Sequence, residues 1–342
     1  MDVRFFPVRF GFYSAILLVS CLVAGCQSSM PTVPRVAGEW WTVARNPDLG
    51  ELNGPPEDEP HAKQQPVDFA VWQAADGPWQ LWSCIRGTKC GGKSRLFYGW
   101  EGAKLTDADW TPKGIRMQAD PGVMHRETLG GLQAPYVLRH AGEYLMFYGD
   151  WVHICMARSS DGKHFERCIA HTAPGTEART GMFSEGPDAN TRDAMVVRID
   201  GVWHCYYTAH PGNAGAVYCR TSRDLKTWSD STIVARGGSA GSGPYSGECP
   251  HVVFYRGYWY LFRTQNYAHP QTTRVYRSTD PMDFGIDTDD KLVAVLEVAA
   301  PEVIHHDGEW YMAALLPDLQ GIRIARLEWV VDPASEVVSQ PR

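Results

Sequence analysis

One pattern recurs five times along the 342 residues and constrains the fold more than any other feature. Each copy has two runs rich in apolar and aromatic residues, joined by a short polar turn. In every copy a glycine is followed two positions later by an aromatic residue. The five pairs are Gly77 with Trp79, Gly142 with Tyr144, Gly201 with Trp203, Gly257 with Trp259, and Gly308 with Trp310. Self-similarity at spacings of about 50 to 65 residues is typical of an array of identical supersecondary units.

Each copy has the features of a β-hairpin, because glycine supplies the positive φ that a tight turn needs. Between copies a second pattern recurs at residues 157–165, 220–228 and 276–284, where a strand-like run ends in Ser-x-Asp and an aromatic residue follows. Two hairpins per unit make about four strands. We therefore predict an all-β chain folded as a five-bladed β-propeller with four-stranded blades. A β-sandwich, the alternative, has no reason to repeat the glycine–aromatic pair.

The two ends of the repeat array predict how the ring closes. Residues 38–45 precede the first unit, and residues 321–330 follow the last hairpin. One of these segments can complete a blade with the other, which removes exposed edge strands. We assign residues 38–332 to a single propeller domain and residues 333–342 to a C-terminal tail.

The N-terminus has the features of an export signal. Arg4 and Arg9 precede an apolar stretch that is too short to span a membrane comfortably. The sequence Val-Ala-Gly-Cys, ending at Cys26, resembles the lipobox of bacterial lipoproteins, which implies removal of residues 1–25 and lipidation of Cys26. Residues 26–37 would then be a flexible tether. An ordinary signal peptide with an incidental cysteine is the alternative. We expect an exported bacterial lipoprotein, periplasmic or on the cell surface, held to the membrane only by its lipid.

Exported chains can form disulfides, and cysteine spacing gives candidates without fixing their connectivity. The candidate pairs are Cys84 with Cys90, Cys155 with Cys168, and Cys205 with Cys219. Cys249 stays unpaired in this scheme, and we expect it to be buried and to point away from the central channel. Neither a CxxC pair nor an HxxxH helix offers a zinc site. We predict no metal and no other cofactor; a calcium ion in the channel is the alternative, which nothing in the sequence indicates.

Acidic residues stand at the start of the first strands of the repeat. In a propeller the first strand of each blade lines the channel, so equivalent positions converge. Nine residues before the turn glycine stand Asp68, Gln133, Arg192, Glu248 and Ala299, and Asp193 takes this place in the third unit if its turn is one residue shorter. Crowding of Asp68, Asp193 and Glu248 should raise the pKa of at least one of them. A proton-holding acid beside an ionised carboxylate suits glycoside hydrolysis.

Asp68 with its hairpin, Arg-Asp at 192–193 and Glu-Cys-Pro at 248–250 together resemble the acidic motifs of five-bladed propeller glycosidases. These are glycoside hydrolase families 32 and 43 and their relatives, and the resemblance covers about residues 60–330. Arg-Asp and Glu-Cys-Pro are similar to family 32, whose members act mostly on fructosides. Glu-x-Pro-His, completed by His251, is similar to family 43, whose members act mostly on arabinosides and xylosides.

The two families imply different roles for the same three residues. The family 32 resemblance implies that Asp68 is a nucleophile, that Asp193 stabilises the transition state and that Glu248 is the acid/base of a retaining mechanism. The family 43 resemblance implies that Asp68 is a general base, that Asp193 tunes the acid and that Glu248 is the general acid of an inverting mechanism. Both alternatives stay open at this point.

Six further residues are candidates for contact with the sugar: Arg192, His251, Trp72, Tyr136, Trp100 and Trp151. The aromatic ones could stack on sugar rings, although packing in the core is the alternative for each. Arg192 alternates with Asp193 in a strand, so the two side chains should point to opposite faces. A salt bridge to a neighbouring blade is its alternative role.

We therefore predict a glycoside hydrolase that cleaves a furanoside-type or related bond in a poly- or oligosaccharide. A non-catalytic carbohydrate-binding lipoprotein is the alternative. Transfer or phosphorolysis is a third possibility, for which the sequence shows no obvious basic cradle beyond Arg192. The formal net charge of −7, without a basic cluster interleaved with aromatic residues, argues against a nucleic-acid partner. We expect a monomer with a carbohydrate substrate.

Overall fold

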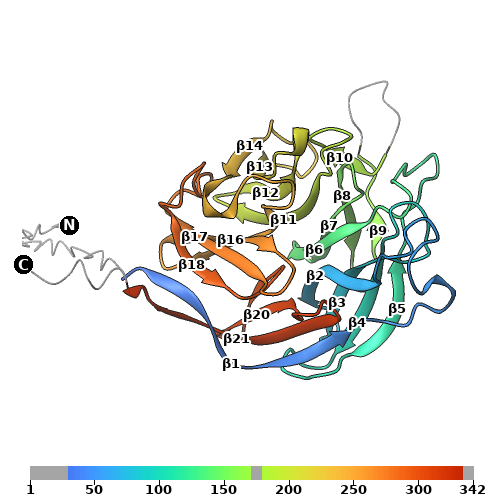
Figure 1. Cartoon of the computed structure of the whole chain (residues 1–342), viewed down its shortest axis with the longest axis horizontal. Helices are drawn as coiled ribbons and strands as arrows, with labels where there is room; N and C mark the ends of the chain where they lie inside the picture. Colours follow the sequence, from blue (N-terminus) through green and yellow to red (C-terminus); the bar gives the residue numbers. More distant parts are fainter. Residues whose placement is uncertain (1–29, 171–178, 334–342) are drawn as a thin grey trace, which may run out of the picture.

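The computed structural model describes residues 30–170 and 179–333, which form a ring of five β-sheets around a common centre (Figure 1). Strands make up 53% of the structure and helices only 3%, so the fold is all-β. Within the described ranges, no helix is long and apolar enough to cross a membrane. The predicted five-bladed propeller is confirmed. The predicted signal peptide and the lipidation site Cys26 lie outside the described residues, as does most of the C-terminal tail.

The first four blades follow one another along the chain, and each of them begins with its innermost strand. The first blade contains β2 (Gln65–Gln73), β3 (Trp79–Arg86), β4 (Leu96–Gly102) and β5 (Thr111–Met117). The second contains β6 (Gln133–His140), β7 (Glu143–Gly149), β8 (Ile154–Ser159) and β10 (Gly181–Phe183), and the short β9 (Glu166–Arg167) also pairs with β8. The third contains β11 (Arg192–Ile199), β12 (Val202–Ala209), β13 (Ala216–Ser222) and β14 (Thr232–Ala235). The fourth contains β15 (Glu248–Tyr255), β16 (Tyr258–Asn266), β17 (Thr272–Ser278) and β18 (Leu292–Leu296).

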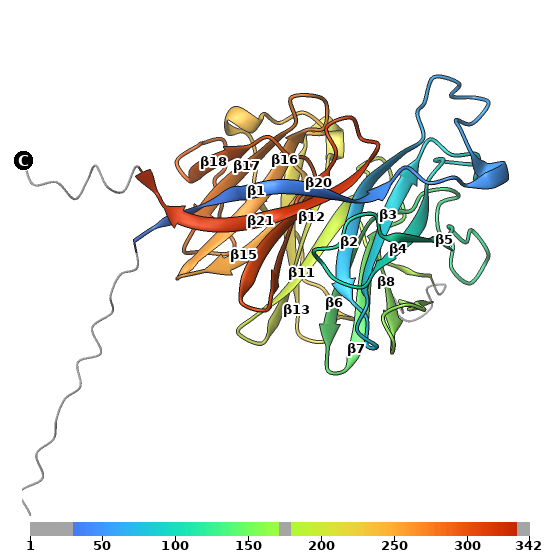
Figure 2. The ribbon, with the colours of Figure 1, turned by 90° about the horizontal axis from the view of Figure 1, so that it is seen from below.

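The last blade joins the two ends of the chain. Its strands are β19 (Glu302–His306), β20 (Glu309–Leu315), β21 (Gly321–Val331) and, outermost, β1 (Thr32–Arg45). β1 and β21 are antiparallel and lie side by side along their length in both views (Figures 1 and 2). The predicted closure is therefore correct. The predicted tether at 26–37 is partly wrong, because β1 begins at Thr32 and its first residues already pair with β21.

The turns of the inner hairpins differ between the first blade and the other four. In blades two to five, two residues with positive φ join the strands, for example Asp200 (47°) and Gly201 (84°). This geometry is that of a type I′ turn, whose twist matches that of the flanking strands. In the first blade five residues, 74–78, separate β2 from β3. In this hairpin nine positions separate Gly77 from the register shift near the start of the inner strand, whereas in the second blade eight positions separate Gly142 from the corresponding shift.

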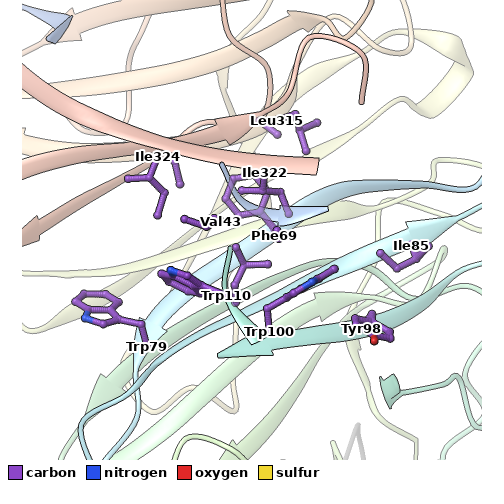
Figure 3. Packing of buried hydrophobic residues seen from close by; sticks show 14 of the residues in the cluster. Val43, Phe69, Trp79, Ile85, Tyr98, Trp100, Trp110, Leu315, Ile322 and Ile324 are labelled. Carbon is purple, nitrogen blue, oxygen red and sulfur yellow. The ribbon is translucent and has the colours of Figure 1, made fainter. Parts of the chain in front are cut away.

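Much of the hydrophobic core lies between blades, and its largest part joins the last blade to the first (Figure 3). There Trp79, Trp100 and Trp110 pack with Val43 and Ile324. Trp100 is only 2% exposed, so the prediction that it contacts a sugar is wrong.

Trp72 also belongs to the core. It is 6% exposed, its indole N–H donates to the carbonyl of Gly162 at 2.8 Å, and its ring packs edge-on against Trp82 and Phe165. Its predicted contact with a sugar is therefore wrong as well.

The predicted disulfides are absent from the described residues, where all seven cysteines are free thiols. Cys205 faces Arg220 in the ladder, and Cys219 faces Tyr206, so the two cysteines are offset by one residue. Their side chains consequently enter different hydrophobic clusters on the two faces of the sheet. The remaining four predicted partners are separated too: Cys84 donates to the carbonyl of Leu132, Cys90 donates to that of Arg95, Cys155 is buried in the core, and Cys168 is half-buried outside it.

Candidate active site

Each blade has one non-glycine residue with positive φ at the start of its inner strand. These residues are Asp68 (33°), Ala134 (41°), Asp193 (59°), Cys249 (45°) and Ala300 (49°). In the first four blades the pairing register shifts at this residue, which marks a β-bulge. We call this place the bulge position. Because it recurs in every blade, it sets the true equivalence between the repeats.

This equivalence corrects the alignment made from the sequence. Cys249, rather than Glu248, is the equivalent of Asp68, and the longer first turn accounts for the slip of one residue. Asp193 is correctly matched to Asp68. Glu248 instead belongs to the position just before the bulge, together with Arg192 of the neighbouring blade. The chain thus brings two adjacent rings of side chains to one end of the channel.

Arg192 and Glu248 form a buried ion pair across two neighbouring blades. The guanidinium donates to both carboxylate oxygens of Glu248, and the Arg192 side chain is only 3% exposed. Its Nε also lies 3.9 Å from Oδ2 of Asp193. The predicted orientation of Arg192 and Asp193 to opposite faces is wrong, because the bulge interrupts the strand alternation between them.

Asp68 is held from the fourth blade by two hydrogen bonds. The hydroxyl of Tyr267 donates to its Oδ1 at 2.6 Å, and the thiol of Cys249 donates to the same oxygen at 3.1 Å. Burial, followed by the nearby charge of Asp68, raises the pKa of Cys249 well above its ordinary value, so it stays a thiol. The expectation that Cys249 points away from the channel is wrong. Its bulge position directs the side chain toward the site.

Asp193 is the most deeply buried of the three carboxyls, with its side chain 1% exposed. Its Oδ2 accepts the backbone N–H of Cys249 at 3.0 Å, whereas its Oδ1 has no hydrogen-bond partner within the described part of the chain. Burial raises its pKa well above the ordinary value, and the charges of Glu248 and Asp68 raise it further. The surroundings of Asp193 therefore favour its protonated form.

A pocket of about 880 Å³ opens above this cluster. Asp68, Gln133, Arg192 and Glu248 form its floor at the starts of inner strands, whereas Asp193 lies in the narrow channel beneath. The walls come from loops that join second strands to third strands and one blade to the next. All these loops lie at the same end of an antiparallel blade, so the topology gathers them around the acids. Such a pocket is large enough for a sugar and part of its neighbour.

The other predicted contact residues separate into two groups. Trp151 lines the pocket. His251 and Tyr136 line the channel below it, and Nε2 of His251 accepts the backbone N–H of Val303 at 3.2 Å. Burial lowers the pKa of His251 to about 4, which keeps the ring neutral. His251 and Tyr136 thus support the floor of the pocket without lining it.

Several pocket residues were missed in the sequence. Tyr267 follows the second strand of its hairpin, outside the repeated pattern, so no local signal pointed to it. Tyr245, 64% exposed, and His210 pack together at the rim. The segment from Arg86 to Arg95 was the clearest missed signal, because it combines four basic residues with three glycines.

One group within the described chain has the geometry to hold a metal ion. A ligand atom from each of Asp68, Asp193 and Cys249 lies within 4.8 Å of the others. Hydrogen bonds from Tyr267 and Cys249 already engage Asp68, however, and we assign no metal to this group. The predicted lack of a cofactor remains a prediction.

No known protein family matches the sequence, and no curated protein matches it either. Solved structures match at low identity. A thermostable family-43 glycoside hydrolase shares 18% identity with a TM-score of 0.58, covering 82% of this chain and 92% of its own. A GH32 β-fructofuranosidase from Bombyx mori shares 15% identity with a TM-score of 0.55, covering 84% of this chain and 61% of its own.

A third structure comes from the GH130 family of mannoside phosphorylases, described as containing glycoside hydrolases that target β-1,2 mannosidic linkages in Candida mannan. It shares 14% identity with a TM-score of 0.55, covering 86% of this chain and 96% of its own. At such identities the likeness concerns the fold. The chain has the five-bladed propeller architecture of these glycosidase structures, as the sequence motifs predicted.

Proposed function

We propose that this protein is a glycoside hydrolase whose substrate lies in the pocket above Asp68 and Glu248. The observation that carries the proposal is the placement of these two carboxylates on the floor of one pocket, with Asp193 directly beneath. Binding of a neutral glycan alone needs no such set of crowded acids. The fold, shared with glycoside hydrolase structures, supports the same assignment.

The contacts of each carboxyl favour distinct roles. Glu248, fixed by Arg192, would be the acid/base: in its protonated form it would give a proton to the leaving oxygen, and it would take one up again afterwards. Asp68, oriented by Tyr267, would act on the anomeric carbon directly or through a water molecule. Asp193 does not line the pocket, so we assign it a positioning role through its hydrogen bond to the Cys249 backbone.

We further propose a furanoside-type or related bond as the substrate, because family 32 and family 43 structures share the fold. Aryl furanosides together with plant and algal polysaccharides form the first screen. NMR of the newly released anomer would then separate retention from inversion.

The decisive variant is Glu248→Gln. Removing the proton donor should lower kcat on a cleaved glycan by about 10²- to 10⁴-fold. Since Arg192 loses its charged partner in this variant, circular dichroism and thermal melting must show that the fold persists. Asp68→Asn provides a second test of kcat, in a variant that keeps the ion pair between Arg192 and Glu248 intact.

Asp188→Asn is the matched control, because Asp188 is an exposed carboxylate on the rim of the same pocket. It should keep nearly full activity. Turnover that is unchanged in both Glu248→Gln and Asp68→Asn would refute the assignment.

A further inference from the structure

One side of the pocket is basic. Arg86 ends β3, and Lys93 and Arg95 follow on the segment that leads to β4. All three line the pocket that contains Asp68 and Glu248. We call these three residues the basic wall. It supplies the cationic cradle that was not evident in the sequence.

The cations of the basic wall have no carboxylate partner among the described residues. Arg86 donates to the amide oxygen of Gln65 at 2.8 Å. Lys93 and Arg95 lie over the ring of Trp151, at 4.8 and 5.2 Å from its centroid. By contrast, the guanidinium of Arg192 is already paired with Glu248. Arg95 also donates to the thiol of Cys84 at 3.9 Å, and the charge of Asp68 acts on it, but no direct ion pair within the described chain neutralises the basic wall.

The backbone that carries the basic wall is fixed before any ligand arrives. The amides of Lys93 and Arg95 donate to the carbonyls of Leu129 and Gly130, both at 2.9 Å. Gly92 has a φ of +55°, and any Cβ there would collide with the carbonyl of Leu129. This close approach of two loops holds the backbone of the segment in place, so a ligand would not have to order it.

We propose that the basic wall binds an oxyanion beside the bond that the acids cleave. A carboxylate, sulfate or phosphate group has the charge and acceptor oxygens that paired Lys and Arg side chains bind. Two sources have this chemistry: an acidic group carried by the sugar itself, or free inorganic phosphate. The inference rests on the proposed function for its position next to the scissile bond, whereas the anion site can be tested without any turnover.

If the oxyanion is free phosphate, the reaction changes but its balance holds. An oxygen of hydrogen phosphate would form the new bond to the anomeric carbon while the glycosidic C–O bond breaks. The leaving oxygen would take the proton from Glu248, and Glu248 would regain a proton from the phosphate. If the oxyanion belongs to the sugar, water remains the acceptor, and the basic wall selects acidic glycans.

The test is calorimetric titration of the full chain with inorganic phosphate, sulfate and glucuronate, at ionic strength held constant with sodium chloride. Glucose serves as the neutral probe. We expect at least one anion to bind saturably and glucose to bind far more weakly. Lys93→Gln should weaken anion binding about fivefold to tenfold, and the double change with Arg95→Gln should weaken it further.

Lys89→Gln is the matched control, since Lys89 is an exposed lysine on the same segment that does not line the pocket. It should bind as the unmodified protein does. Absence of saturable binding for all three anions, or an equal loss in the Lys89 and Lys93 variants, would overturn the proposal.

Binding of glucuronate or sulfate with turnover independent of phosphate identifies a sugar-borne anion, and turnover that requires phosphate identifies the free ion. Anion binding in a protein without glycosidase activity would refute the proposed function alone.

Discussion

Glu302→Gln should change how the stability of the propeller depends on pH. Glu302 starts the inner strand of the last blade and lines the channel. It accepts the backbone N–H of Val71 on the first blade at 2.8 Å, so this bond crosses the seam where the ring closes. Burial raises its pKa from 4.5 to about 8, despite the opposing effect of that hydrogen bond.

The sign follows from proton binding. Between pH values of about 4.5 and about 8 the folded protein keeps a proton on Glu302 that the unfolded chain has lost, so stability falls as the pH rises. Each pH unit in this window costs about 1.4 kcal/mol. From about pH 5 to about pH 7.5 the free energy of unfolding should therefore fall by about 3 kcal/mol through this residue.

Glutamine keeps the acceptor for Val71 and carries no charge at any pH. In the variant the free energy of unfolding should no longer fall with pH through this residue, so the variant should become more stable relative to the unmodified protein as the pH rises. His251 contributes in the opposite direction, because its lowered pKa of about 4 makes stability fall as the pH drops below 6.5. Its contribution is common to both proteins and cancels in the difference.

Urea unfolding at a series of pH values, followed by tryptophan fluorescence, measures the difference directly. Glu309→Gln is the control, because Glu309 pairs with Arg326 on the surface of the same blade and its side chain is 57% exposed. It should leave the slope with pH as it is. Equal slopes for Glu302→Gln and the unmodified protein would show that Glu302 is not a buried, proton-holding group.

Two further predictions concern the channel and the thiols. Asp193→Asn should lower activity yet melt at or above the temperature of the unmodified protein near pH 8, because it removes the cost of ionising a buried carboxyl whose pKa is raised; a clearly lower melting temperature would contradict this. Thiol titration of the unfolded protein without reductant should detect all seven described cysteines, and reductant should leave the melting temperature unchanged. A marked drop with reductant would reveal a disulfide, since losing one typically costs 2–5 kcal/mol.

The repeat in the sequence was sufficient to predict the blades, because turn glycines and alternating aromatic residues act locally within each hairpin. It also predicted the closure by residues 38–45 and 321–330, which pair as β1 and β21. The alignment of inner strands was less secure. Because the first turn is longer than the others, counting back from Gly77 aligned Asp68 with Glu248, whereas the structure aligns it with Cys249.

The aromatic residues that would contact the sugar were predicted poorly, because the sequence does not say which face of a strand packs against the neighbouring blade. Trp100 and Trp151 both stand near strand or loop ends. Packing between the last and first blades buries Trp100, whereas Trp151 lies in a loop beside Lys93 and Arg95. The cysteine pairs failed for a related reason, since closeness in sequence does not place two side chains on one face.

The sequence by itself determined the architecture and the presence of acids at one end of the channel, since both follow from the period of the repeat. Only the tertiary structure decided which side chains meet there. Residues as different as Asp68, Ala134 and Cys249 adopt positive φ at the bulge position, so no residue type marks it. The bond from Arg192 to Glu248 joins two neighbouring blades, and the bond from Tyr267 to Asp68 joins the fourth blade to the first, so neither exists before the blades have packed together.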